Sequence, residues 1–315
     1  MSSDIWFGAH VPPEGRDFEE MKRICLMAEE GGFDLFTVTD HFMKMRDPNS
    51  PTGHPLECWT TLAGLSAITR KIKLGPLVTC YAYRRPTLLA KMATTVDIIS
   101  KGRFILGIGA CPQWAELEFK GFLGRFPPPS ERVQGLKETV EICKKMLTNY
   151  RTSYYGKIYQ VNNVLNLPPP AQRSVPIMIG GRGERVTMRI AAKYADISHV
   201  FTGNLEMLEH KLTVLKKHCT TVGREYNEIR KATAIRVLLG RTQDELDKKL
   251  NKTAKSLDIS KKEVKKRVGV GCGTTKNVID VIDQYVNRGI GLITFQFHDT
   301  NDIKLLAEEV IPEFK

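Results

Sequence analysis

The stretch DFEEMKRICLMAEEGGFDLFTVTDHF, residues 17–42, joins the two patterns that decide the fold. Its first part has a helix-like pattern, with Asp17 as a candidate N-cap and glycine at the C-terminal end. Its second part, residues 33–40, is a short apolar and β-branched run typical of a strand buried on both faces. The stretch therefore predicts a helix that leads directly into a buried strand.

The same alternation continues along the chain. Further strands are predicted at residues 4–11, 72–81, 103–110, 175–181, 196–201, 232–240 and 291–298, and further helices at 56–69, 85–102, 130–147, 184–195, 204–223 and 274–289. Eight strands with intervening helices predict a (β/α)8 TIM barrel with insertions. An open doubly wound sheet is the runner-up, but the first β–α turn, HVPPEGRD (10–17), lacks the glycine fingerprint of that fold.

Composition favours a soluble protein with one domain, residues 1–315. Apolar residues make up 42% of the chain, and no apolar run approaches the roughly 20 residues that span a bilayer. The N-terminus has no signal-peptide pattern. The seven cysteines are scattered and form no CxxC pair, which argues against a disulfide framework or a zinc site and favours a reducing cytoplasm. We therefore expect a cytoplasmic protein with no metal site.

The formal charge of +12 indicates affinity for anions in general. Part of this charge lies in KSLDISKKEVKKR, residues 255–267, within a predicted basic helical insertion at residues 240–272. Such a cluster is either a solvated face or a contact for a partner. No basic motif interleaved with aromatic residues accompanies it, so nucleic acid is not an expected partner.

Polar residues follow several predicted strands, and in a barrel these segments meet at one rim. The stretch IMIGGRGER (177–185) places three glycines around Arg182 before a helix, a layout that suits a phosphate, although a tight β–α turn also explains it. Asp40 and His41 end a strand and form either a proton-handling pair or a satisfied core pair. Cys111, after the glycines of LGIGACPQW, is either structural or a reactive thiol.

These segments together resemble the luciferase-like monooxygenase superfamily, and within it the branch of oxidoreductases that use the deazaflavin coenzyme F420. The resemblance covers nearly the whole chain. It is carried by AEEGGFDLFTVTDHF (28–42), residues 56–110, FPPPSERVQGLKE (126–138), residues 176–201 and GIGLITFQF (289–297). It implies a (β/α)8 barrel with a flavin-like ring over the C-terminal ends of the strands.

The resemblance also implies site residues. His41 and Asp40 match the active-site histidine and its neighbour, and Glu116 is a weak candidate for a proton-donating glutamate. Some members have a catalytic tryptophan shortly after the histidine, where this chain has Lys44-Met45. The remaining matches are cofactor-binding positions along four strand ends: Leu77, Val78, Thr79, Gly109, Ala110, Gly180, Gly181, Arg182, Gly183, Glu184, Arg185, His199, Val200 and Phe201.

Three functions are consistent with the sequence. The first is hydride transfer between F420 and a small organic substrate, in a homodimer such as relatives commonly form. The second is an FMN-dependent monooxygenase on the same scaffold. The third, a basic nucleic-acid-binding or scaffold protein, has only the cluster at 255–267 in its favour.

Overall fold

Parallel strands form the main sheet of the protein. The computed structural model describes residues 5–45 and 47–315, so the first residue of the strand predicted at 4–11 lies outside the described residues. The sheet order is β3-β2-β1-β12-β10-β9-β8-β5-β4, with β11 paired to β10. The strands are β1 Trp6–His10, β2 Leu35–Val38, β3 Lys73–Pro76, β4 Thr79–Cys80, β5 Leu106–Gly109, β8 Ile177–Gly180, β9 Ile197–Val200, β10 Arg230–Gly240, β11 Gly271–Thr274 and β12 Ile290–Phe297.

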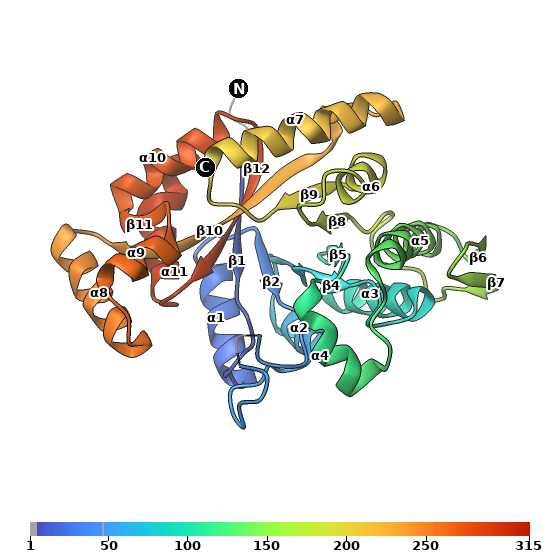
Figure 1. The fold of residues 1–315 in the computed structure, drawn as a ribbon, viewed down its shortest axis with the longest axis horizontal. Helices are drawn as coiled ribbons and strands as arrows, with labels where there is room; N and C mark the ends of the chain where they lie inside the picture. Colours follow the sequence, from blue (N-terminus) through green and yellow to red (C-terminus); the bar gives the residue numbers. More distant parts are fainter. Residues whose placement is uncertain (1–4, 46) are drawn as a thin grey trace.

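The ends of this sheet meet, so that it forms a nearly closed barrel. The Ile105 N–H donates to the Leu74 carbonyl at 2.9 Å, which joins the β3 edge to the β5 side. Helices lie around the outside of the strands (Figure 1). The predicted (β/α)8 barrel is confirmed. The longer helices are α1 Phe18–Glu30, α2 Cys58–Ile68, α3 Pro86–Ser100, α5 Pro129–Thr148, α6 Thr187–Tyr194, α7 Leu205–Val222, α8 Gln243–Leu257, α9 Lys261–Val268 and α10 Thr275–Val286.

The barrel interior is filled below the rim by a layer to which different strands contribute. Leu35, Met178, Ile197 and Leu292 belong to this buried cluster, each from a different strand. A larger apolar cluster fills the space between the strands and the outer helices. Side chains of this kind on both faces explain why the strands appear in the sequence as continuous apolar runs. The interior layer also leaves only the rim open for a ligand.

The strand predicted at 72–81 is divided in two. A non-proline cis peptide joins Leu77 to Val78, between β3 and β4. Two further features were not predicted from the sequence. They are β11 and an antiparallel hairpin, in which β6 (Arg151–Tyr155) pairs with β7 (Gln160–Leu165). Figure 1 shows this hairpin on the opposite side of the molecule from α8 and α9.

The segment 240–272, predicted as a basic helical insertion, forms α8, α9 and the start of β11. These two helices bury a small apolar cluster of their own against β10, which includes Leu238, Leu246 and Val264. Within residues 5–45 and 47–315, no helix combines the length and the apolar character needed to cross a membrane.

Candidate active site

A cavity of about 610 Å³ opens at the C-terminal rim of the barrel. Its size lies within the range of cavities that hold cofactors and small ligands. The loops and strand ends that the sequence predicted to converge do so here. The cavity is lined by His10, Thr39, His41, Met45, Leu77, Val78, Thr79, Cys80, Gly109, Ala110, Cys111, Pro112, Trp114, Gly180, Gly181, Arg182, Gly183, Thr187, His199, Phe201, Arg236 and Gln296.

His41 is held at the rim by a buried carboxylate that comes from a distant segment. Glu118 accepts hydrogen bonds from the backbone N–H groups of Phe42 at 2.8 Å and Met43 at 3.0 Å, and its Oε2 lies 3.1 Å from His41 Nδ1. Tyr83 donates its hydroxyl to the same carboxylate. Burial alone would raise the pKa of Glu118, but the hydrogen bonds from His41, Tyr83 and Met43 hold that pKa below its ordinary value.

The tautomer of His41 follows from this contact. An ionised carboxylate is only an acceptor, so Nδ1 of His41 carries the hydrogen that it shares with Glu118. Nε2 is then the ring nitrogen that can exchange a proton with a ligand. The indole ring of Trp114 packs on the same imidazole, with the ring centroids 4.3 Å apart. His41 is therefore oriented by Glu118 on one side and covered by an aromatic ring on another.

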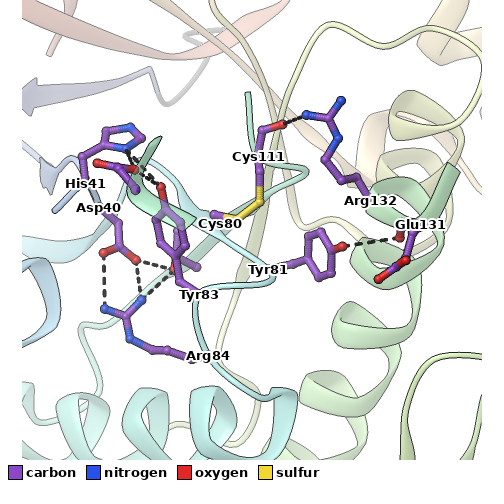
Figure 2. Close-up of a disulfide and its surroundings, with 11 residues drawn as sticks. Asp40, His41, Cys80, Tyr81, Tyr83, Arg84, Cys111, Glu131 and Arg132 are labelled. Carbon is purple, nitrogen blue, oxygen red and sulfur yellow. Dashed lines mark hydrogen bonds and ion pairs between the residues drawn. A yellow bond between two sulfur atoms is a disulfide. The ribbon is translucent and has the colours of Figure 1, made fainter. Parts of the chain in front are cut away.

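Asp40 points away from the cavity, which explains why a buried strand ends on two polar residues. Its carboxylate accepts hydrogen bonds from Arg84 Nη1 at 2.7 Å and Nη2 at 3.3 Å, and from the indole N–H of Trp59. Arg84 also donates to Glu57 at 2.5 Å. Asp40 therefore joins β2 to the segment after β4 and to α2, while its neighbour His41 faces the cavity (Figure 2).

A glycine- and arginine-containing loop forms another part of the rim. After β8, Gly181, Arg182 and Gly183 line the cavity, and α6 begins at Thr187. Lys211 of α7 fixes this loop from behind: its ammonium donates to the Arg182 carbonyl at 3.0 Å and also to Glu184. The loop thus presents a guanidinium and a helix N-terminus to the cavity, a combination that suits a phosphate.

Two buried histidines form the floor of the cavity. His10 Nδ1 lies 3.0 Å from the Thr37 hydroxyl, and His199 Nε2 lies 3.0 Å from the Thr294 hydroxyl. Burial lowers the pKa of His10 to about 4 and that of His199 to about 3. Both imidazoles are therefore neutral near pH 7, and they add hydrogen-bonding groups to the floor without adding charge.

The rim glycines make room for Val78 as well as for a ligand. A Cβ on Gly109 would lie 2.7 Å from a Val78 methyl, and one on Gly180 would lie 2.9 Å from the other methyl. These glycines therefore allow the Val78 side chain to pack against the neighbouring strands β5 and β8.

The expectation about the cysteines needs a correction. Cys80 at the end of β4 and Cys111 after β5 form a disulfide, with their Cα atoms 4.9 Å apart. The two residues are 31 positions apart in the sequence, so no short spacing reveals the pair. Parallel pairing of Cys80 with Gly109 brings them together at the rim. The cysteine count correctly excluded a disulfide framework but missed this one bond.

The structure gathers most of the predicted site residues around one cavity, but not all of them. Asp40, Glu116, Glu184, Arg185 and Val200 do not line it. Glu116 pairs with Lys120 at 3.1 Å and contacts Gln113, so its role as a proton donor stays a prediction. Glu118 and Trp114 were not selected from the sequence, and Tyr83 was not assigned a role there. The short helical stretch at 113–123, which includes α4 (Glu116–Glu118), brings the first two of these to His41.

The pH dependence of stability offers a check on Glu118. Its pKa is lower in the folded protein, so its contribution to stability is present above its unfolded pKa and is lost as the pH falls through the folded value. Glu118→Gln has no such group to protonate. We expect the wild type to lose more unfolding free energy than Glu118→Gln below about pH 5. Urea unfolding at stepped pH measures this, with Glu116→Gln as the control, and parallel acid curves for wild type and Glu118→Gln would contradict the assignment.

The chain is similar to known proteins in both sequence and fold. Over 199 residues the chain is 34% identical to the pyrimidine monooxygenase RutA of Agrobacterium fabrum, covering 61% of this chain and 52% of that protein. Over 194 residues it is 30% identical to the F420-dependent glucose-6-phosphate dehydrogenase of Nocardia farcinica, covering 61% and 56% respectively. The chain thus spans about half the length of these curated relatives. Its fold is similar to that of the F420-dependent tetrahydromethanopterin reductase of Methanopyrus kandleri, with a TM-score of 0.80, 21% identity and 99% coverage of both chains.

The fold and the rim cavity define a (β/α)8-barrel enzyme whose site is built from the C-terminal ends of the strands. Residues 3–290 match the family of luciferase-like monooxygenases. The chain belongs to this family. The relatives that are similar to it include F420-dependent oxidoreductases and monooxygenases.

Proposed function

We propose that this enzyme binds coenzyme F420 in the rim cavity and transfers a hydride between it and a small organic substrate. The observation that carries the proposal is the placement of His41 and the Gly181–Gly183 loop around one cavity. Bound F420 would supply the redox chemistry, because its deazaflavin ring accepts or donates a hydride.

The described residues fit a flat ring with an anionic tail. Leu77, Val78 and Phe201 give the cavity an apolar wall, and Arg182 gives it a cationic end. The buried hydroxyl of Thr39, which lines the cavity, has no hydrogen-bond partner among the described residues and could serve a bound ligand. The exposed Arg185, in the loop before α6, and the exposed Arg189, on α6, extend the positive charge, which suits the acidic tail of F420.

The residues around the bound ring would have different roles. The apolar wall and the Leu77–Val78 segment would hold the ring and exclude water. His41 would give a proton to the substrate, or take one from it, at Nε2, because Glu118 fixes the hydrogen on Nδ1. Trp114 would cover the imidazole and restrict the space left for the substrate.

An FMN-dependent monooxygenase is the second candidate, and the likeness to pyrimidine monooxygenases favours it. Both cofactors carry a phosphate and a flat ring, so the loop does not discriminate between them. Titrating the protein with F420 and separately with FMN, while following cofactor fluorescence, tests the proposal. Tight binding of FMN without a response to F420 would replace the first candidate by the second. A panel of alcohols, sugar phosphates, enones and pterin-linked one-carbon carriers would then identify the substrate.

Arg182 gives a separate prediction. A charged hydrogen bond to a phosphate is worth about 1.5–3 kcal/mol, so Arg182→Ala should weaken cofactor binding roughly tenfold or more. The fluorescence titration measures this directly. Arg151→Ala, on the remote β6–β7 hairpin, is the control and should leave the affinity unchanged. Equal affinities of wild type and Arg182→Ala would show that the Gly181–Gly183 loop does not bind the cofactor phosphate.

Three further expectations remain proposals. We infer that the enzyme works in the cytoplasm, forms a homodimer and has no nucleic-acid partner. The basic residues 255–267 lie at the end of α8 and in α9, where the five lysines and the arginine are all exposed. Binding to mixed-sequence DNA that weakens steeply as the salt concentration rises would contradict the proposal that the enzyme has no nucleic-acid partner.

A further inference from the structure

The Cys80–Cys111 disulfide forms part of the cavity wall. Both residues line the cavity, Cys80 with 4% of its surface exposed and Cys111 half-buried. The other five cysteines of the chain are free, and none of them lines this cavity. We propose that this pair is a thiol–disulfide exchange site for small anionic thiols that enter through the cavity.

The surroundings of the bond favour an anionic reagent. Arg182 and Arg236 line the same cavity, and Arg132 donates from Nη1 to the Cys111 carbonyl at 3.2 Å. Figure 2 shows the disulfide between this arginine on one side and the pair of His41 and Tyr83 on the other. No carboxylate of residues 5–45 or 47–315 lines the cavity. A site with one sign of charge raises the local concentration of ions of the opposite sign.

The exchange follows ordinary thiol–disulfide chemistry, and its electrons and protons balance. The thiolate of the small thiol attacks the Sγ of Cys111, which is the more exposed of the two residues. The S–S electron pair passes to Cys80, which takes up a proton. A second small thiolate attacks the sulfur that has been added, which forms the small-molecule disulfide and releases Cys111 as a thiolate that takes up the second proton. The protein gains two electrons and two protons in total, and two small thiols lose them. The reverse reaction with the small disulfide restores the bond.

Breaking the bond would free the segment that organises His41. Cys111 has a left-handed backbone with φ of 59°, which is unfavourable for a residue with a side chain, and it begins the loop that leads to Trp114 and Glu118. The disulfide anchors this loop to β4 at its first residue. Phe119 and Ala115 of the same segment pack with Cys80 and Tyr83 in one apolar cluster. The oxidation state of the pair therefore controls how firmly residues 111–123 hold Glu118 and Trp114 against His41.

Two measurements on the full-length protein test the proposal, and neither needs a cofactor, so their failure is distinct from that of the proposed function. The first compares the rate of reduction by 3-mercaptopropionate, which is anionic, with the rate by the cationic thiol 2-aminoethanethiol, at equal thiolate concentration. Each rate is divided by the rate of the same thiol with an uncharged small disulfide, because the two thiolates differ in intrinsic nucleophilicity. Alkylation under denaturing conditions and mass spectrometry count the free cysteines, which should rise from five to seven. We expect the anionic thiol to react about tenfold faster or more.

The second measurement is hydrogen exchange of the oxidised protein, the reduced protein and Cys111→Ser. The amides of residues 113–123 should exchange at least about tenfold faster in the latter two, whereas those of α3 should not change. Cys272→Ser, which removes a free cysteine outside the cavity, is the control and should behave as the wild type. Should Cys111→Ser fail to fold, reduction of the wild type gives the same comparison.

Three results would overturn the proposal. One is seven free cysteines in protein purified under oxidising conditions. Another is faster reduction by the cationic thiol than by the anionic thiol. Faster reduction by a protein thiol reductase than by the anionic thiol, at equal thiol concentration, would have the same meaning. The last is equal exchange of residues 113–123 in the oxidised and reduced states.

Discussion

Replacing His41 with alanine is expected to lower turnover about 10²–10⁴-fold while cofactor affinity changes little. His41 lines the cavity, and its Nδ1 is committed to Glu118, which leaves Nε2 for proton exchange with the substrate. Alanine removes this nitrogen but leaves the Gly181–Gly183 loop and the apolar wall in place. Steady-state turnover with the best substrate of the panel, together with the fluorescence titration, separates the two effects.

The control for this variant is His54→Ala. His54 is an exposed histidine whose Nε2 contacts the Ser50 carbonyl, and it does not line the cavity. Its replacement should leave turnover unchanged. If His41→Ala also retained full turnover, His41 would have no part in the proton transfer. If His41→Ala lost cofactor binding instead, its main role would be to hold the ring.

The barrel could be predicted because its evidence is local and repeated. The stretch 17–42 already contains one helix and one buried strand, and the same pattern recurs along the chain. The hairpin β6–β7 was missed because it is short and half-exposed: its strands alternate in burial, and exposed polar residues such as Arg151 hide the pattern. The split of 72–81 at the Leu77–Val78 cis peptide has no signal in the amino-acid composition.

The site could be predicted only where its residues follow strands directly. His41 and the Gly181–Gly183 loop were found because strand ends meet at one rim. Glu118 lies 77 residues from His41, and it reaches the imidazole through a short helical stretch with no sequence period of its own. Glu116 is two residues away on the same stretch, but it faces Lys120 and not His41. Sequence alone cannot choose between two such carboxylates, because the direction of each side chain depends on how the stretch packs on Tyr83 and Phe42.

Arg84→Met is expected to lower the free energy of unfolding by about 3–5 kcal/mol, because it leaves the buried Asp40 carboxylate without its cation. Asp40 has no exposed side-chain surface and Arg84 has only 9%, so water cannot replace the lost partner. Urea denaturation measures the change. The double variant Asp40→Asn with Arg84→Met removes both charges and should recover part of the loss. If Arg84→Met lost less than about 1 kcal/mol of unfolding free energy, the Asp40–Arg84 pair would behave as an exposed ion pair does. That result would contradict a structural role for the pair behind His41.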